Sequence, residues 1–169
     1  IMGLVCGLIG DIVLDLKYVY KEQNDIYLNS GILAFAIGHA FYFAGAILYC
    51  YETINLLLPI LVAVGISAVL TPIIYLISNK MGLEFGKFKW QSMLYAFVLV
   101  FMSAFTIYLA CLQIEFIIMA VGITLFLLSD LVLSMQYFGG KTEDKFLTIV
   151  NHGLYYAAQI LVATFLFLI

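Results

Sequence analysis

Between Gly122 and Phe138 the chain reads G-I-T-L-F-L-L-S-D-L-V-L-S-M-Q-Y-F, an apolar run in which Asp130 is the one charged residue. Together with the apolar residues before it, this run is long enough to cross a lipid bilayer as a helix. A charged carboxylate inside the hydrocarbon costs about 2.5 kcal/mol or more, and carboxylates found there mark functional sites. Asp130 is therefore the first candidate for a functional residue.

The composition extends this interpretation to the whole chain. Of 169 residues, 66% are hydrophobic and 10% are charged, whereas soluble domains have roughly 25% charged residues. We therefore expect an all-α, polytopic transmembrane helix bundle. The chain has no arginine and no basic patch with interleaved aromatic residues, so nucleic-acid binding is not expected. We expect membrane spans at about 1–18, 28–50, 54–78, 90–111, 116–138 and 146–169.

The lysines predict the orientation of these spans. All seven lie in three connections, residues 17–27, 79–89 and 139–145, while the other two connections carry Glu52 and Glu115. Because loops rich in lysine and arginine stay on the cytoplasmic side, we expect these three loops to be cytoplasmic in a multi-pass integral membrane protein.

A second copy of the Asp130 segment stands near the start of the chain. At one constant offset, Asp11 aligns with Asp130, Val13 with Val132, Leu14 with Leu133 and Tyr18 with Tyr137. Downstream, H-A-F-Y-F-A-G-A-I from His39 matches H-G-L-Y-Y-A-A-Q-I from His152. The lysine pattern makes these two copies parallel repeats within a single transmembrane domain, 1–169, with the first repeat remnant at 1–50 and the second repeat at 54–169. The symmetry also predicts two further helices before residue 1, eight in all.

The polar residues of the repeats form a candidate site. Asp11 is expected roughly 9 Å and Asp130 roughly 12 Å from the cytoplasmic ends of their helices. Two carboxylates in an apolar site repel each other and lose hydration, so we expect one of them to hold a proton near neutral pH. Such a pair can perform acid-catalysed hydration or hydrolysis. Alternatively, each carboxylate is neutralised structurally by hydrogen bonds from other helices. Two Asp and two His could also bind a metal, but no ligand spacing favours this, and no metal is expected.

Four motifs resemble those of the lysoplasmalogenase family, the YhhN-like membrane proteins. They are G-D-x-x-L from Gly10, F-A-I-G-H-A-F-Y from Phe35, S-D-L-V-L from Ser129 and Y-Y-A-A-Q from Tyr155, and Tyr95 also looks like the family's pattern. The resemblance implies hydrolysis of the vinyl ether of lysoplasmalogens, which yields a fatty aldehyde and a glycerophospho-choline or -ethanolamine. It implies an alkenyl lysophospholipid as the partner, within membrane lipid, and no cofactor.

This resemblance suggests roles for the polar residues. We take Asp11 and Asp130 as the catalytic acid and its anionic partner, in an order that the sequence leaves open. The residues expected to bind the substrate or water are His39, Tyr42, His152, Tyr155, Tyr156 and Gln159. A polar stripe on the 90–111 span, which includes Ser92 and Tyr95, is interpreted as packing between helices. The alternatives are a proton-coupled transporter and a non-catalytic lysolipid-binding protein. The oligomeric state is left open.

Overall fold

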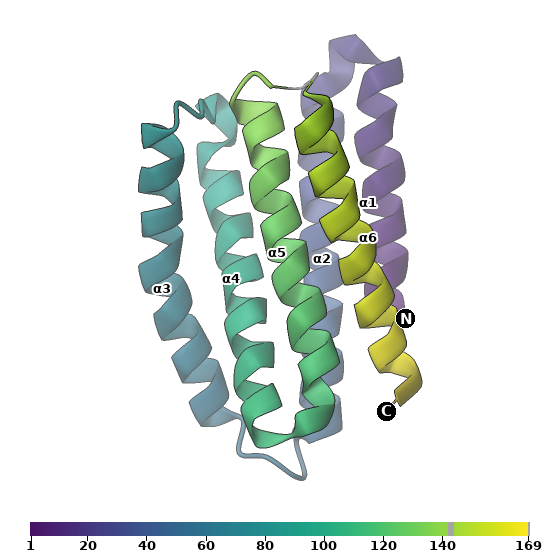
Figure 1. Ribbon diagram of the computed structural model, residues 1–169, viewed down its shortest axis with the longest axis vertical. Coiled ribbons are helices and arrows are strands. Elements are labelled where there is room, and N and C mark those ends of the chain that lie inside the picture. The colour runs from purple at the N-terminus through teal and green to yellow at the C-terminus, as the bar shows by residue number, and fades with distance from the viewer. Residues whose placement is uncertain (142–143, 169) are drawn as a thin grey trace. The chain divides into compact units, whose positions relative to one another are not determined.

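The computed structural model describes residues 1–141 and 144–168, with all of their side chains except those of Tyr18, a residue of the repeat, and Lys21. Thr142 and Glu143 of the expected loop 139–145, and Ile169 of the last expected span, lie outside the described residues. The all-helical fold predicted from the sequence is confirmed (Figure 1). The long elements are α1 (Met2–Val19), α2 (Asn24–Cys50), α3 (Leu57–Lys80), α4 (Lys89–Leu112), α5 (Ile117–Phe138) and α6 (Lys145–Leu168).

Five helices in the described part of the chain, α2 to α6, are long and apolar enough to cross a membrane. They coincide with five of the expected spans to within about one helical turn, and they identify the chain as an integral membrane protein. The expected span at 1–18 also forms a helix of 18 residues, α1. This helix is not among the five, and it carries three charged residues, Asp11, Asp15 and Lys17.

Glycines and a capping aspartate mark the helix ends at two of the lysine-bearing connections. The connections after α3 and α5 contain Gly82, with φ of 81°, and Gly140, with φ of 65°, a backbone region that favours glycine. The first turn of α6 is capped by Asp144, whose Oδ1 accepts hydrogen bonds from the backbone N–H groups of Phe146 at 2.9 Å and Leu147 at 3.2 Å. The polar loops are thus encoded by glycines and by one capping carboxylate.

The chain divides into two compact units, and the first, residues 1–56, is the helix pair α1 and α2. Glycines line the surface where these two helices meet. A Cβ atom placed on Gly10 would lie 2.8 Å from the Phe35 ring, and one on Gly38 would lie 3.1 Å from the carbonyl oxygen of Gly3. Small residues at such positions let two backbones approach closely, which is how helices associate in lipid.

The second unit, residues 57–169, contains α3 to α6, and each of these helices packs mainly against its neighbour in the chain (Figure 1). Phe105, Leu109, Phe116 and Ile123 are completely buried in its core. The Phe116 ring also packs against Phe165, with 5.1 Å between ring centroids. Hydroxyl groups add bonds between helices, because the Ser103 Oγ on α4 lies 2.8 Å from the Thr124 Oγ1 on α5.

The α5–α6 contact repeats a feature of the first unit. Gly122 on α5 stands in the same register as Gly3 on α1, at the offset that relates Asp130 to Asp11. A Cβ atom on Gly122 would lie 3.0 Å from the Val162 Cγ2 and 3.2 Å from the Ala158 carbonyl oxygen, both on α6. In each copy, therefore, the helix that carries the aspartate meets the following helix through a glycine near its start.

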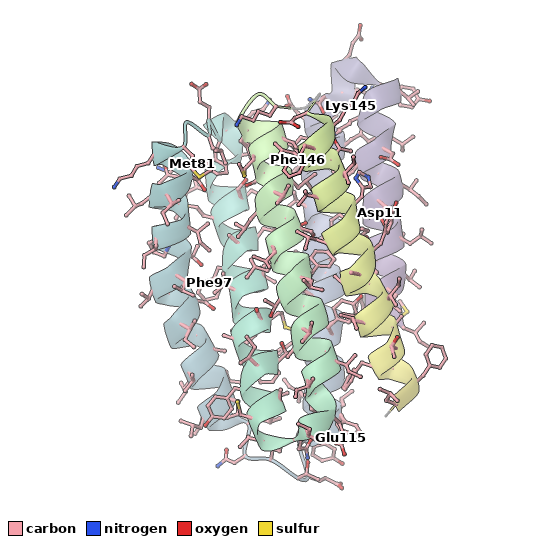
Figure 2. All side chains as sticks on the ribbon, viewed as in Figure 1. Asp11, Met81, Phe97, Glu115, Lys145 and Phe146 are labelled. Atoms are coloured by element: carbon pink, nitrogen blue, oxygen red, sulfur yellow. The ribbon has the colours of Figure 1, made fainter. Side chains whose placement is uncertain are left out.

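The lysine-bearing loops of the second unit gather at one end. Figure 2 shows Met81, Lys145 and Phe146 at that end and Glu115 at the opposite end. The two loops are connected, because the backbone N–H of Glu84 donates to the carbonyl oxygen of Phe138 at 2.8 Å. The segregation of lysine expected for residues 79–89 and 139–145 is thus present in the geometry of this unit, while the cytoplasmic location of this end stays a prediction.

Candidate active site

Asp130 lies inside α5, eight residues before this helix ends at Phe138, which is roughly 12 Å along the axis. Its side chain is half-buried, and its Oδ2 accepts a hydrogen bond of 2.5 Å from the hydroxyl of Tyr95 on α4. Tyr95 is six residues from the start of α4 at Lys89, roughly 9 Å, so the two groups lie at similar depths. So short an O–H···O distance is typical of a hydrogen bond to an ionised oxygen.

A third helix, α6, contributes Tyr155 and Gln159 to this region. The Gln159 Nε2 donates to the Tyr155 hydroxyl oxygen at 2.9 Å, and Tyr155 interacts electrostatically with Tyr95. The Tyr155 ring is held by an edge contact with Phe126, with 5.4 Å between centroids. Asp130, Tyr95, Tyr155 and Gln159 are called the Asp130 cluster below. It brings together side chains of α4, α5 and α6.

His152 and Tyr156, two further residues expected to bind the substrate or water, lie on the same face of α6 as Tyr155 and Gln159, and both are exposed. The rings of His152 and Tyr156 are 5.8 Å apart, and those of Tyr156 and Tyr155 are 5.7 Å apart. The face therefore runs without a break from exposed His152 to half-buried Tyr155 and Gln159. This arrangement gives α6 a polar and aromatic surface that leads toward the Asp130 cluster.

Asp11, His39 and Tyr42 belong to the first unit. Asp11 is half-buried on α1, whereas His39 and Tyr42 are buried on α2. The two rings of His39 and Tyr42 meet edge to face with 5.8 Å between centroids, and Tyr42 packs where Gly3 leaves room for its ring. That Asp11 shares a site with Asp130 stays a prediction.

Both histidines make the same hydrogen bond. The His39 Nδ1 lies 2.9 Å from the Phe35 carbonyl oxygen, and the His152 Nδ1 lies 2.8 Å from the Thr148 carbonyl oxygen, each four residues earlier. Because a carbonyl oxygen only accepts, Nδ1 carries a hydrogen in both rings. When such a ring is neutral, its Nε2 is a hydrogen-bond acceptor. The duplicated sequence thus gives the two histidines the same arrangement, in which Nδ1 donates to the carbonyl oxygen four residues earlier.

The model of the YhhN family matches residues 1–166, nearly the whole chain. The chain belongs to the YhhN family. This is the family of lysoplasmalogenases, so the resemblance inferred from the four motifs is confirmed. No curated protein and no solved structure matches the chain.

Tyr95 belongs to this site although it was not among the substrate-binding or catalytic candidates expected from the sequence. The polar stripe of α4 was interpreted as packing between helices, and the Tyr95 hydroxyl does bond to another helix, at the Asp130 carboxylate. One sequence signal pointed to it, since Tyr95 and Asp130 lie at similar depths from ends of their helices that bear the lysine loops. A tyrosine at the depth of an intramembrane carboxylate is a candidate partner for it.

The groups in the Asp130 cluster suit proton transfer and hydrogen bonding. It offers one carboxylate, two phenols and one amide, which together can hold a charge, orient water and donate or accept protons. Within residues 1–141 and 144–168 of this YhhN-family protein, no group of three or more His, Cys, Asp or Glu side chains could hold a metal ion.

Proposed function

We propose that this protein is a membrane hydrolase that cleaves the vinyl-ether bond of lysoplasmalogens, releasing a fatty aldehyde and a glycerophospho-choline or -ethanolamine. The observation that carries the proposal is the carboxylate of Asp130 inside the bundle, bonded by Tyr95 and backed by Tyr155 and Gln159. Its repeat partner Asp11 supplies the second acid. Membership of the YhhN family supports the same reaction.

The chemistry needs one acid, one anion and one water. Protonation of the β-carbon of the vinyl ether by a carboxylic acid turns the double bond into an oxocarbenium ion. Water adds to the cationic carbon, and the resulting hemiacetal collapses to the aldehyde and the glycerol hydroxyl. One water is consumed and the catalytic proton is returned. Asp11 and Asp130 provide the acid and the anion, and the anion stabilises the cation and accepts the proton of the attacking water.

The remaining polar residues place the substrate and the water. His39 and His152, with Nδ1 protonated, present Nε2 as an acceptor for a water or substrate hydroxyl. The phenols of Tyr42, Tyr155 and Tyr156 offer hydroxyl donors, and these side chains are buried, half-buried and exposed, respectively. A lysophospholipid has a single hydrocarbon chain, which would lie among the apolar helices while its phosphate stays near the lysine loops, on the cytoplasmic side.

The test is aldehyde release from an alkenyl lysophospholipid by the full-length protein in lipid nanodiscs. We expect turnover of the alkenyl lipid and none of its saturated alkyl analogue, which has no double bond to protonate. In ¹⁸O-water the glycerophospho product should stay unlabelled, because water attacks the alkenyl carbon and the glycerol oxygen leaves intact.

The variants Asp11→Asn and Asp130→Asn should each lower kcat by about 10²- to 10⁴-fold, the usual contribution of a general acid or base. The matched control is Asp15→Asn, one helical turn beyond Asp11 on an exposed part of α1, which should retain activity. No turnover by the wild type would reject the hydrolase. Tight lysolipid binding without turnover would favour a binding protein, and protonophore-sensitive uptake into vesicles would favour a transporter.

A further inference from the structure

The direction of the Tyr95–Asp130 hydrogen bond distinguishes the two acids. The Tyr95 hydroxyl donates, and the Asp130 Oδ2 accepts at 2.5 Å. A phenol holds its proton far more tightly than a carboxyl group does, so the hydrogen in this bond belongs to the tyrosine. The length of 2.5 Å is that of a hydrogen bond to an ionised oxygen, which favours the carboxylate form of Asp130.

The residues behind Tyr95 reinforce the same polarity. An amide N–H can only donate, so the bond from Gln159 to the Tyr155 oxygen leaves the Tyr155 hydroxyl hydrogen to point elsewhere. Tyr155 interacts electrostatically with Tyr95, and the Asp130 carboxylate is the acceptor beyond it. Two donated bonds are therefore present in the cluster, from Gln159 to Tyr155 and from Tyr95 to the Asp130 carboxylate. In a low-dielectric interior the Tyr95–Asp130 bond is electrostatically stronger than it would be in water.

We propose that Tyr95 is a positioning residue that holds Asp130 ionised and in a fixed orientation, which makes Asp130 the anionic partner and Asp11 the proton donor. The assignment rests on the proposed hydrolase. It settles the order that the sequence left open, because a carboxylate held in the ionised form has no proton to give to carbon.

The assignment balances through one turnover. Asp11 gives its proton to the β-carbon, and the electron pair of the double bond forms the new C–H bond. Water attacks the oxocarbenium carbon and passes a proton to Asp130. As the hemiacetal collapses, Asp130 gives that proton to the leaving glycerol oxygen, and the hemiacetal hydroxyl gives its proton to Asp11. Both acids end in their starting forms.

Infrared spectroscopy of the intact protein tests the charge of Asp130 without any turnover. With ¹³C in the aspartate carboxyl groups, subtraction of the Asp130→Asn spectrum isolates the Asp130 band. We expect a carboxylate stretch in the wild type at neutral pH, and a protonated carboxylic-acid stretch in Tyr95→Phe, where the donor is lost. A protonated Asp130 in the wild type, or an unchanged band in Tyr95→Phe, would overturn the proposal.

Kinetics with the alkenyl lysophospholipid provide a second readout. Tyr95→Phe should lower kcat by about 10- to 100-fold, as expected for loss of a hydrogen bond to a charged group, with little change in KM. The matched control is Tyr108→Phe, the same substitution farther along α4, which should leave both constants unchanged. A Tyr95→Phe variant with wild-type kcat would refute the positioning role. If the wild type has no turnover at all, the hydrolase fails, and the infrared result still decides whether Tyr95 keeps Asp130 ionised.

Discussion

The substitution Gly122→Ala tests the close contact between α5 and α6. The added Cβ would lie 3.0 Å from the Val162 Cγ2 and 3.2 Å from the Ala158 carbonyl oxygen, so α6 has to move away by a few tenths of an ångström. Overpacking of this kind costs about 1–3 kcal/mol. Replacing glycine by alanine inside a helix returns about 1 kcal/mol. The free energy of unfolding of Gly122→Ala should therefore fall by a net amount of about 0–2 kcal/mol.

Gly65→Ala is the matched control, because it makes the same change inside α3 where a Cβ atom meets nothing within 4 Å. This variant should gain up to about 1 kcal/mol of unfolding free energy. The two variants should thus differ by about 1–3 kcal/mol, a difference in which helix propensity cancels and overpacking remains. Reversible unfolding in bicelles, followed by steric trapping, measures both. Equal responses of the two variants would refute the close α5–α6 contact.

Three further predictions concern individual hydrogen bonds. Asp144→Ala removes the cap of α6 and should lower the unfolding free energy by about 0.5–2 kcal/mol, while Asp144→Asn should keep most of it in the same unfolding assay. A double-mutant cycle of Ser103→Ala and Thr124→Val should give a coupling energy of about 0.6 kcal/mol, and a coupling near zero would mean that the bond is not formed. The hydrogen bond to Glu52 raises the pKa of the Tyr51 hydroxyl, so Glu52→Ala should lower that pKa in an NMR titration, and an unchanged value would contradict the bond.

The helices themselves were predictable because lipid requires long apolar runs and the lysines mark the loops between them. The largest deviation, the start of α2 at Asn24 where residue 28 was expected, also has a local reason. Asn24 and Asp25 are polar and extend α2 beyond its apolar run, and Asp25 stands in the first turn, where a negative charge stabilises a helix N-terminus. Hydropathy alone does not include such a turn.

The partner of Asp130 was less predictable. Tyr95 is 35 residues away on another helix, and their contact depends on how α4 and α5 rotate about their axes. In a soluble protein the apolar face of a helix would indicate that rotation. In a membrane protein the side chains that face lipid are as apolar as those that face the core, so the sequence does not distinguish the two faces. Whether Asp11 and Asp130 share a site also depends on how their helices are rotated, and it stays a prediction.

The contact pattern of the second unit has a consequence for biogenesis. Within this unit the contacts run between consecutive helices, α3 with α4, α4 with α5 and α5 with α6, so most stabilising contacts join segments that leave the ribosome one after the other. Folding dominated by contacts local in sequence is fast, since little loop-closure entropy is lost before the contacts form. In this unit α4, α5 and α6 therefore each find a packing partner that is already in the bilayer.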